Sequence, residues 1–259
     1  MSQAAICKIC ERESLQIFKA NILKKYSIDY YQCTDCGFAQ TDEPFWLAEA
    51  YSQSMNLGDT GQMVRTISNA VKVKNIIEQL LKPEGQFLDY AGGYGLFTRT
   101  MRDFGFDFYW EDLYTENLIA KGYEKNSLKK FEAITVFECF EHLNNPIAEI
   151  EELLRSSDTI IFTTNLIQVP APKEWWYYGF DHGQHIAFYS KASLEFLAKK
   201  FSCRIFSKFG VHILTKRKIS NTRLYYAMLK SKITLNIFGL NSNKSLTTKD
   251  HLSLIAKHS

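Results

Sequence analysis

The stretch that most constrains this chain runs from Gln86 to Thr98 and reads QFLDYAGGYGLFT. A short apolar segment ends at Asp89 and is followed by a turn rich in glycine. Glycine lets the backbone turn sharply and approach a ligand, and a helix that starts behind such a turn directs free N–H groups and the positive end of its dipole at a negative group. The pattern predicts a strand, a ligand-binding loop and a helix, in that order.

A second acidic residue stands where the next strand of such a unit would end. Asp112 lies 17 residues after Gly95, behind a predicted helix over 96–104, a capping Gly105 and an apolar segment over 106–110. An acid at that point can accept hydrogen bonds from both hydroxyls of a ribose, as in dinucleotide-binding folds. The two acids and the loop between them predict a βαβ unit whose ligand contains a nucleoside.

Two classes of nucleoside cofactor fit this unit to different degrees. The dinucleotide pattern G-x-G-x-x-G/A would place Thr98 where close packing of helix on strand needs a small residue, which disfavours a nicotinamide cofactor. The pattern D-x-G-x-G-x-G reads DYAGGYG here, with Ala91 in place of the first glycine. This stretch resembles motif I of class I S-adenosylmethionine (SAM) methyltransferases.

Three further blocks in the family's order strengthen the resemblance. Residues 131–146 read FEAITVFECFEHLNNP and resemble the family's fourth-strand segment, 159–164 read as a fifth strand, and 185–201 resemble the block that opens the next helix. The match covers about residues 60–215. The resemblance implies an α/β fold with a Rossmann-like sheet, helices on both faces of that sheet, and SAM as the cofactor.

The resemblance also assigns residues to the cofactor site. The positions that match the family's loop and strand ends are Asp89, Tyr90, Ala91, Gly93, Gly95, Asp112 and Glu138. SAM carries a sulfonium whose methyl group is already electrophilic, so the enzyme must mainly align an acceptor with the S–CH3 bond. An acceptor that keeps its proton at neutral pH, such as a sugar hydroxyl, also benefits from a base.

Two histidines are candidates for that base. His185 lies in a loop rich in aromatic residues and glycine, after the predicted fifth strand, where this fold places its acceptor pocket. The block resembles the Y-H-E-H segment of sugar C-methyltransferases that also carry an N-terminal zinc module, although Gln184 replaces the Glu and His182 the Tyr. Aligning the blocks puts His185 on the last histidine, the expected base of that family. His142 is the second candidate, with a hydrogen-bonded structural role as its alternative.

A separate pattern occupies the N-terminal segment. Two C-x2-C pairs, 22 residues apart, contain four of the six cysteines: Cys7, Cys10, Cys33 and Cys36. In a reducing compartment such pairs favour a tetrahedral zinc site over disulfides. Four thiolates leave zinc no open coordination position, so the predicted ion is structural and stabilises a module with too little core of its own.

Composition and charge narrow the remaining choices. The chain of 259 residues is 46% apolar and 23% charged, as is ordinary for a globular protein. No apolar run has the length of a signal peptide or of a membrane span, which predicts a cytoplasmic protein. The net charge of +3 is uneven, because residues 191–259 carry 14 Lys and Arg against 2 Asp and Glu. This section predicts affinity for an anionic acceptor or peripheral contact with an anionic membrane, with a solvated basic face as the alternative.

The sequence thus predicts a zinc-binding module over 1–45, a methyltransferase domain over 46–215 and a basic extension over 216–259. The leading hypothesis is SAM-dependent methylation of oxygen or carbon on a sugar, a sugar nucleotide or a precursor in polysaccharide biosynthesis. An RNA or other macromolecular acceptor is the second hypothesis, although no aromatic and basic interleaving marks a nucleic-acid site. A non-catalytic binding subunit is the third, prompted by Ala91 and by a short polar stretch where a third strand would stand.

Overall fold

The computed structural model describes residues 4–52, 59–125, 127, 130–237 and 245–258. The chain divides into two units. The first comprises residues 1–52 and 136–217, and the second comprises 53–135 and 218–259.

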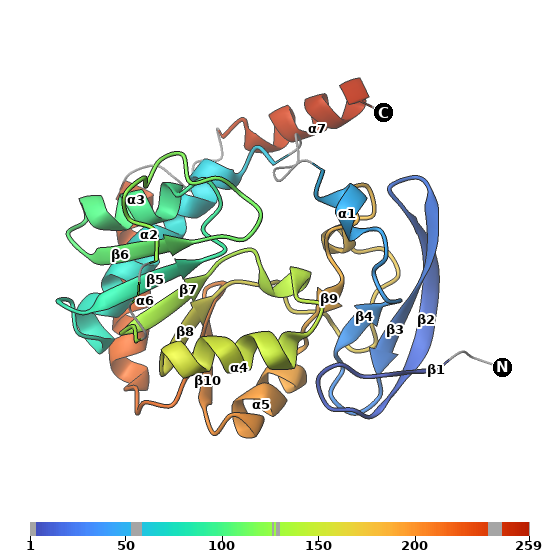
Figure 1. Ribbon diagram of the computed structural model, residues 1–259, viewed down its shortest axis with the longest axis horizontal. Coiled ribbons are helices and arrows are strands. Elements are labelled where there is room, and N and C mark those ends of the chain that lie inside the picture. Colours follow the sequence, from blue (N-terminus) through green and yellow to red (C-terminus); the bar gives the residue numbers. More distant parts are fainter. Residues whose placement is uncertain (1–3, 53–58, 126, 128–129, 238–244, 259) are drawn as a thin grey trace. The chain divides into compact units, whose positions relative to one another are not determined.

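The first unit contains a five-stranded antiparallel sheet built mainly from the N-terminal segment (Figure 1). Its strands, in spatial order, are β1 (Ala4–Ile6), β2 (Glu13–Ile22), β3 (Tyr26–Cys33), β4 (Ala39–Thr41) and β9 (Ala187–Phe188). The hairpin between β2 and β3 turns at Leu23 and Lys24, both with positive φ. Because β9 pairs with β4, a segment from the loop that contains His185 completes the N-terminal sheet.

The first unit also contains a second group of strands and five helical segments. β8 (Thr159–Phe162), β11 (Val211–Thr215) and β10 (Arg204–Lys208) are neighbours in that order with antiparallel pairing. The helices are α1 (Leu47–Ala50), η1 (Phe140–His142), α4 (Pro146–Ser156), η2 (Trp176–Tyr178) and α5 (Lys191–Lys200). Helix α5 begins at a capping box, in which Ser190 accepts from the Ser193 N–H at 3.0 Å.

The second unit holds the predicted βαβ unit. Its strands are neighbours in the order β7 (Ala133–Val136), β5 (Gln86–Tyr90) and β6 (Asp107–Glu111), with Val136 already belonging to the first unit. β5 and β6 are parallel, with Asp89 opposite Trp110, and α3 (Leu96–Asp103) connects them. The other helices are α2 (Gln62–Leu80), α6 (Asn221–Ile237) and α7 (Thr247–His258).

These elements confirm the predicted α/β fold with a Rossmann-like sheet. The helix expected over 96–104 is α3, and the apolar segment expected over 106–110 is β6. The polar stretch after Gly122 contributes one parallel bridge, between Glu124 and Trp110. In the part of the chain that is described, no helix combines the length and the apolar character needed to span a membrane.

A buried carboxyl group holds the βαβ unit together. The Asp89 side chain accepts one hydrogen bond from the Thr98 hydroxyl and one from the Thr135 hydroxyl, each at 3.0 Å. These contacts tie β5 to α3 and to β7. Burial raises the pKa of Asp89 to about 7, and the charge of Asp112 adds to the rise while both threonine hydroxyls oppose it.

The raised pKa predicts how stability changes with pH. Asp89 in the unfolded chain ionises near pH 4, so its contribution to stability is complete at acid pH and is lost as the pH rises from about 4 to 7. We expect Asp89→Asn to gain free energy of unfolding relative to the wild type over that interval, by up to a few kcal/mol at about 1.4 kcal/mol per pKa unit. Denaturant unfolding at pH 5 and pH 8 measures this difference.

Asp103→Asn is the matched control, since Asp103 lies exposed at the end of α3 and pairs with Arg99. Its stability relative to the wild type should change little between the two pH values. Parallel pH profiles for Asp89→Asn and the wild type would contradict the buried, proton-binding state of Asp89.

Candidate functional site

The loop after β5 is a tight turn held by its neighbours in the second unit. Ala91, Gly93 and Gly95 all have positive φ, at 56°, 54° and 85°. Ala91 therefore occupies a conformation that glycine adopts at less cost, which explains why the family pattern has glycine there. The Gly93 carbonyl accepts from the Trp110 indole at 2.8 Å. A Cβ on Gly93 would meet nothing within 4 Å, so this part of the loop faces open space.

Asp112 fixes the same loop from the end of β6. Its Oδ2 accepts from the Gly93 N–H at 2.9 Å, and its Oδ1 accepts from the Tyr114 and Thr115 N–H groups at 2.8 Å each. The predicted cofactor residues of the second unit therefore do come together. They are Asp89, Tyr90, Ala91, Gly93, Gly95 and Asp112. Sequence reasoning missed Thr98 and Thr135 as partners of Asp89, because their pairing depends on the fold.

The remaining predicted residues form a cluster in the first unit. Glu138 follows β7 with a positive φ of 50°, and its Oε1 accepts from the Thr163 hydroxyl at 2.8 Å. The short helix η1 then presents Glu141 and His142. The His142 and His185 rings meet edge to face, with centroids 4.9 Å apart and an interplanar angle of 73°. The structure thus brings together both candidate bases.

Backbone carbonyls determine the tautomers of these two histidines. Nδ1 of His142 lies 2.9 Å from the Gln184 carbonyl oxygen, and Nδ1 of His185 lies 2.6 Å from the Tyr177 carbonyl oxygen. A carbonyl can only accept, so each Nδ1 carries the proton and each Nε2 carries a lone pair. His142 thereby makes the hydrogen bond expected of a structural role, and the same Nδ1 also lies 2.9 Å from the Tyr51 hydroxyl oxygen, which can accept a share of its N–H.

Burial keeps both rings neutral. It lowers the pKa of His142 to about 4, with the Gln184 carbonyl opposing the shift. It also holds the pKa of His185 well below the usual range, and the neighbouring His142 and His182 add to this effect. At neutral pH both Nε2 lone pairs can therefore accept a hydrogen bond or bind a metal ion.

Glu141 differs from the other members of the cluster. It is 0% exposed, and neither carboxylate oxygen accepts a hydrogen bond. Burial raises its pKa to about 8, followed by the charge of Glu138, and the nearby hydroxyls of Tyr177 and Thr164 offset this only in part. The sequence pattern did not distinguish Glu141, since only the packing around it reveals the unpaired carboxyl group.

The aromatic run beside this cluster divides between core and surface. Tyr177 and Tyr178 are buried, and the Tyr178 hydroxyl donates to the Pro172 carbonyl at 2.7 Å. Trp176 is 78% exposed. Within this run, Tyr177 contacts His185 through its carbonyl oxygen and its ring. Trp176 is accessible to a flat ligand.

The four N-terminal cysteines gather in one place. The sulfur atoms of Cys7 and Cys36 lie 3.6 Å apart and those of Cys10 and Cys33 lie 3.4 Å apart, and all four lie within 4.8 Å of one another. Zinc bound tetrahedrally by thiolates at 2.3 Å places its sulfur ligands about 3.8 Å apart. The cluster has the spacing of such a site.

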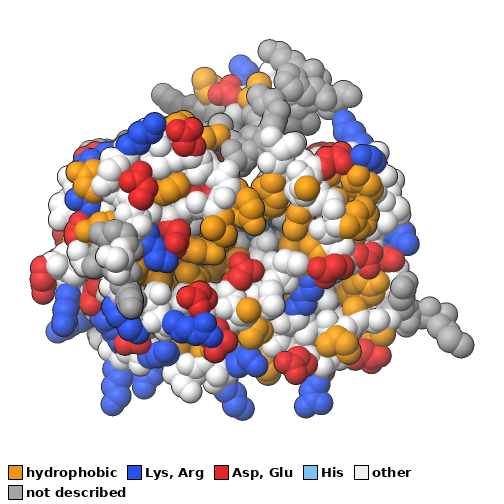
Figure 2. Space-filling model, in the orientation of Figure 1, with side chains coloured by type: hydrophobic (Ala, Val, Ile, Leu, Met, Phe, Trp, Pro, Cys, Tyr) orange, Lys and Arg blue, Asp and Glu red, His pale blue; other side chains and the backbone are white. Residues whose placement is uncertain are grey.

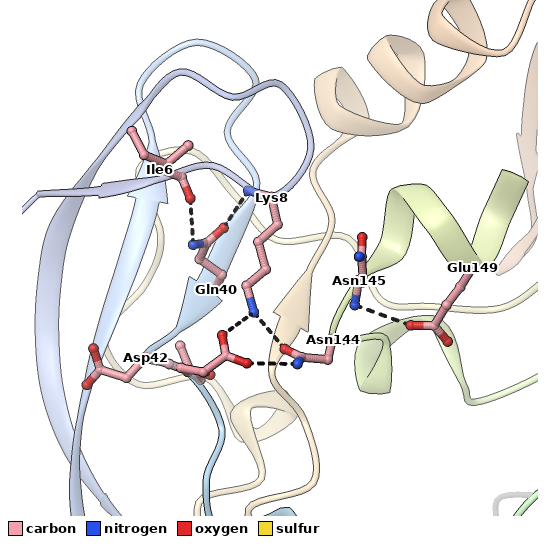
Figure 3. Close-up of polar contacts among 9 residues, drawn as sticks. Ile6, Lys8, Gln40, Asp42, Asn144, Asn145 and Glu149 are labelled. Carbon is pink, nitrogen blue, oxygen red and sulfur yellow. Dashed lines mark hydrogen bonds and ion pairs between the residues drawn. The ribbon is translucent and has the colours of Figure 1, made fainter.

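Polar contacts link the first cysteine pair to the segment after His142 (Figure 3). The Lys8 ammonium donates to Asn144 Oδ1 at 2.6 Å and to Glu43 Oε2 at 3.3 Å, and Asn144 Nδ2 donates to Glu43 Oε1 at 3.0 Å. The Gln40 side chain accepts from the Lys8 N–H and donates to the Ile6 carbonyl. Hydrogen bonds within the first unit thus connect the segment that carries the first cysteine pair to the segment that follows His142.

Comparison with solved structures found fold similarities at low sequence identity. An O-methyltransferase family protein from Burkholderia thailandensis is 12% identical, with a TM-score of 0.49, over 68% of this chain and 63% of that one. The magnesium protoporphyrin IX methyltransferase from Synechocystis PCC 6803, solved with bound SAH, is 15% identical, with a TM-score of 0.41, over 65% of this chain and 90% of that one. The chain thus spans less than two thirds of the Burkholderia protein.

Comparison with known sequences identified a family but no individual curated relative. No curated protein matched the chain. The family model described as a methyltransferase domain matches residues 65–208, which is more than half of the chain and includes the loop after β5 and both candidate histidines. The chain therefore belongs to the methyltransferase-domain family.

Proposed function

We propose that this methyltransferase transfers the methyl group of SAM to an oxygen or carbon of a sugar, a sugar nucleotide or a surface-glycan precursor. The observation that carries the proposal is the pair of neutral histidines, His142 and His185, whose Nδ1 atoms are held by carbonyls. A histidine in this state can take the proton that a sugar hydroxyl must lose, and we assign that role first to His185. The accessible Trp176 ring suits stacking on a sugar.

The loop after β5 supports SAM as the methyl donor. The open space beside Gly93 leaves room for a ligand at the start of α3, where free N–H groups favour a carboxylate. Asp112 is already fixed by three backbone N–H groups, and its remaining lone pairs can accept from ribose hydroxyls. SAM would supply the electrophilic methyl group, and these residues would hold and orient its adenosyl part.

The basic C-terminal section supports an anionic acceptor or peripheral contact with an anionic membrane. Helix α6 exposes Arg223, Lys230 and Lys232 and contains no acidic residue. The same helix exposes the apolar side chains of Tyr225, Tyr226, Leu229, Ile233 and Ile237. On the face drawn in Figure 2, by contrast, basic and acidic side chains are interspersed. The excess of positive charge is therefore a property of particular segments and not of the whole surface.

We also propose that the cysteine cluster binds one structural zinc ion and that residues 1–45 form the zinc-binding module. The four sulfur atoms leave no coordination position for a substrate. The ion would stabilise the segments that carry β1 to β4.

The first prediction concerns the cofactor. Asp112→Asn keeps the size of the side chain but replaces an acceptor by a donor toward Gly93 and toward the ribose. We expect calorimetry to show SAM affinity at least about tenfold weaker than in the wild type. Asp103→Asn should bind SAM normally. Unaltered affinity in Asp112→Asn would exclude this cofactor geometry, and a wild type that cannot be saturated with SAM would favour a non-catalytic binding subunit.

The second prediction concerns the acceptor. In His185→Gln we expect kcat for methyl transfer to fall by about 100-fold or more, with SAM affinity unchanged, because the group that deals with the acceptor proton is lost. Mass spectrometry of sugar nucleotides incubated with enzyme and SAM measures the transfer. His251→Gln, a change in helix α7, should retain activity. Equal rates in both variants would remove His185 from the reaction.

The third prediction concerns zinc. Cys36→Ser should lower the zinc content from one ion per chain to none and lower the unfolding temperature, since the binding energy of a structural zinc is also folding energy. Cys203→Ser is the matched control, because Cys203 is a half-buried thiol outside the cluster. Elemental analysis and calorimetry measure both effects. Zinc retained in full by Cys36→Ser would refute the four-thiolate site.

A further inference from the structure

The cluster of Glu141, His142 and His185 contains a feature that proton transfer alone leaves unexplained. Glu141 is fully buried, and neither of its oxygens makes a hydrogen bond of ordinary geometry, although the hydroxyls of Tyr177 and Thr164 lie near enough to lower its pKa. Burial of a carboxyl group without hydrogen bonds is unfavourable, so native structures avoid it unless another interaction compensates. The compensating group would have to be a donor or a cation.

The positions of the ligand atoms point to a cation. One carboxylate oxygen of Glu141 and one ring nitrogen each of His142 and His185 all lie within 4.8 Å of one another. Metal bonds of about 2.0 to 2.2 Å place tetrahedral ligands about 3.4 Å apart, so side-chain shifts of about 1 Å would close the site. These shifts are within the reach of side-chain rotation.

The outer hydrogen bonds of the histidines have the arrangement of metal ligands. Each ring donates Nδ1–H to a backbone carbonyl, of Gln184 and of Tyr177, and keeps the Nε2 lone pair. Metal-binding histidines almost always have such a partner, which fixes the tautomer and the ring orientation.

We propose that Glu141, His142 and His185 bind a divalent first-row transition-metal ion, in a site distinct from the four cysteines. Two imidazoles and one carboxylate favour such an ion over Ca²⁺ or Mg²⁺, which prefer all-oxygen ligands. Three protein ligands leave coordination positions open, unlike the four thiolates of the cysteine cluster.

A role for this ion in activating the acceptor rests on the proposed function, whereas binding of the ion does not. Vicinal hydroxyl oxygens of a sugar can fill the open positions, and coordination to the ion lowers the pKa of a bound hydroxyl. With the ion in place, the Nε2 lone pair of His185 would be used in coordination, and the proton of the bound hydroxyl would leave to solvent water. The ion, in place of His185, would then make the acceptor oxygen nucleophilic.

Manganese is the probe that separates the two metal sites. Soft thiolates select zinc, whereas Mn²⁺ binds carboxylate and imidazole ligands and competes poorly for four cysteines. Zinc-loaded protein titrated with MnCl2, without SAM or acceptor, should bind about one Mn²⁺ per chain, seen as loss of the electron paramagnetic resonance signal of the free ion. Zn²⁺ added beyond the first equivalent should displace the Mn²⁺.

The variants identify the ligands. Glu141→Gln and His185→Gln should each weaken Mn²⁺ binding by at least about tenfold while keeping one zinc per chain and normal SAM affinity, which shows that both variants are folded. Glu152→Gln, on the exposed side of α4, should bind Mn²⁺ as the wild type does. If the wild type binds no Mn²⁺, or if both variants bind it unchanged, the proposal is wrong. Since no methyl transfer is measured, this result is independent of the proposed acceptor.

Discussion

The backbone of Ile186 joins the segments on which the histidine cluster depends. Its N–H donates to the Glu141 carbonyl at 2.9 Å, and its carbonyl accepts from the Thr41 N–H at 3.3 Å. The next residue, Ala187, pairs with Gln40 in the N-terminal sheet. Because His185 precedes Ile186, these bonds place its ring beside Glu141 and His142. The side chains of the cluster therefore come from distant parts of the sequence, and a few backbone hydrogen bonds set their spacing.

The segments that carry the four N-terminal cysteines are hydrogen-bonded to the segments that carry the two histidines. Lys8, between the cysteines of the first pair, donates to Asn144, two residues after His142. The Ser190 hydroxyl, five residues after His185, donates to the Cys36 carbonyl at 2.6 Å and caps α5. Each cysteine pair is thus bonded close to one of the histidines. A closed metal site with no chemistry of its own can in this way support chemistry elsewhere in the first unit, by fixing the two segments that carry His142 and His185.

What the sequence could predict was local. Short patterns with a fixed spacing predict the βαβ unit, the acid at residue 112 and the paired cysteines. In the structure Asp112 contacts the loop after β5, and the four cysteine sulfur atoms lie close together. The partners of Asp89 could not be read in this way, since Thr98 and Thr135 stand at different distances along the chain and meet only when α3 and β7 lie against β5. The same holds for Glu141. The sequence shows it as one residue of a family motif, and only the structure shows that its carboxyl group is buried without a hydrogen bond.

The two roles open to His185 require the same tautomer, so the hydrogen bond to Tyr177 does not separate them. Glu141 does. A carboxylate assists a histidine base by accepting its ring N–H, but Glu141 makes no such bond, and backbone carbonyls lie at the Nδ1 atoms of both histidines. A metal ion uses both features at once, because it takes the Nε2 lone pairs as ligands and supplies the missing partner of the carboxylate. Coordination would therefore give the buried carboxyl group a role, whereas proton transfer by His185 alone leaves it without one.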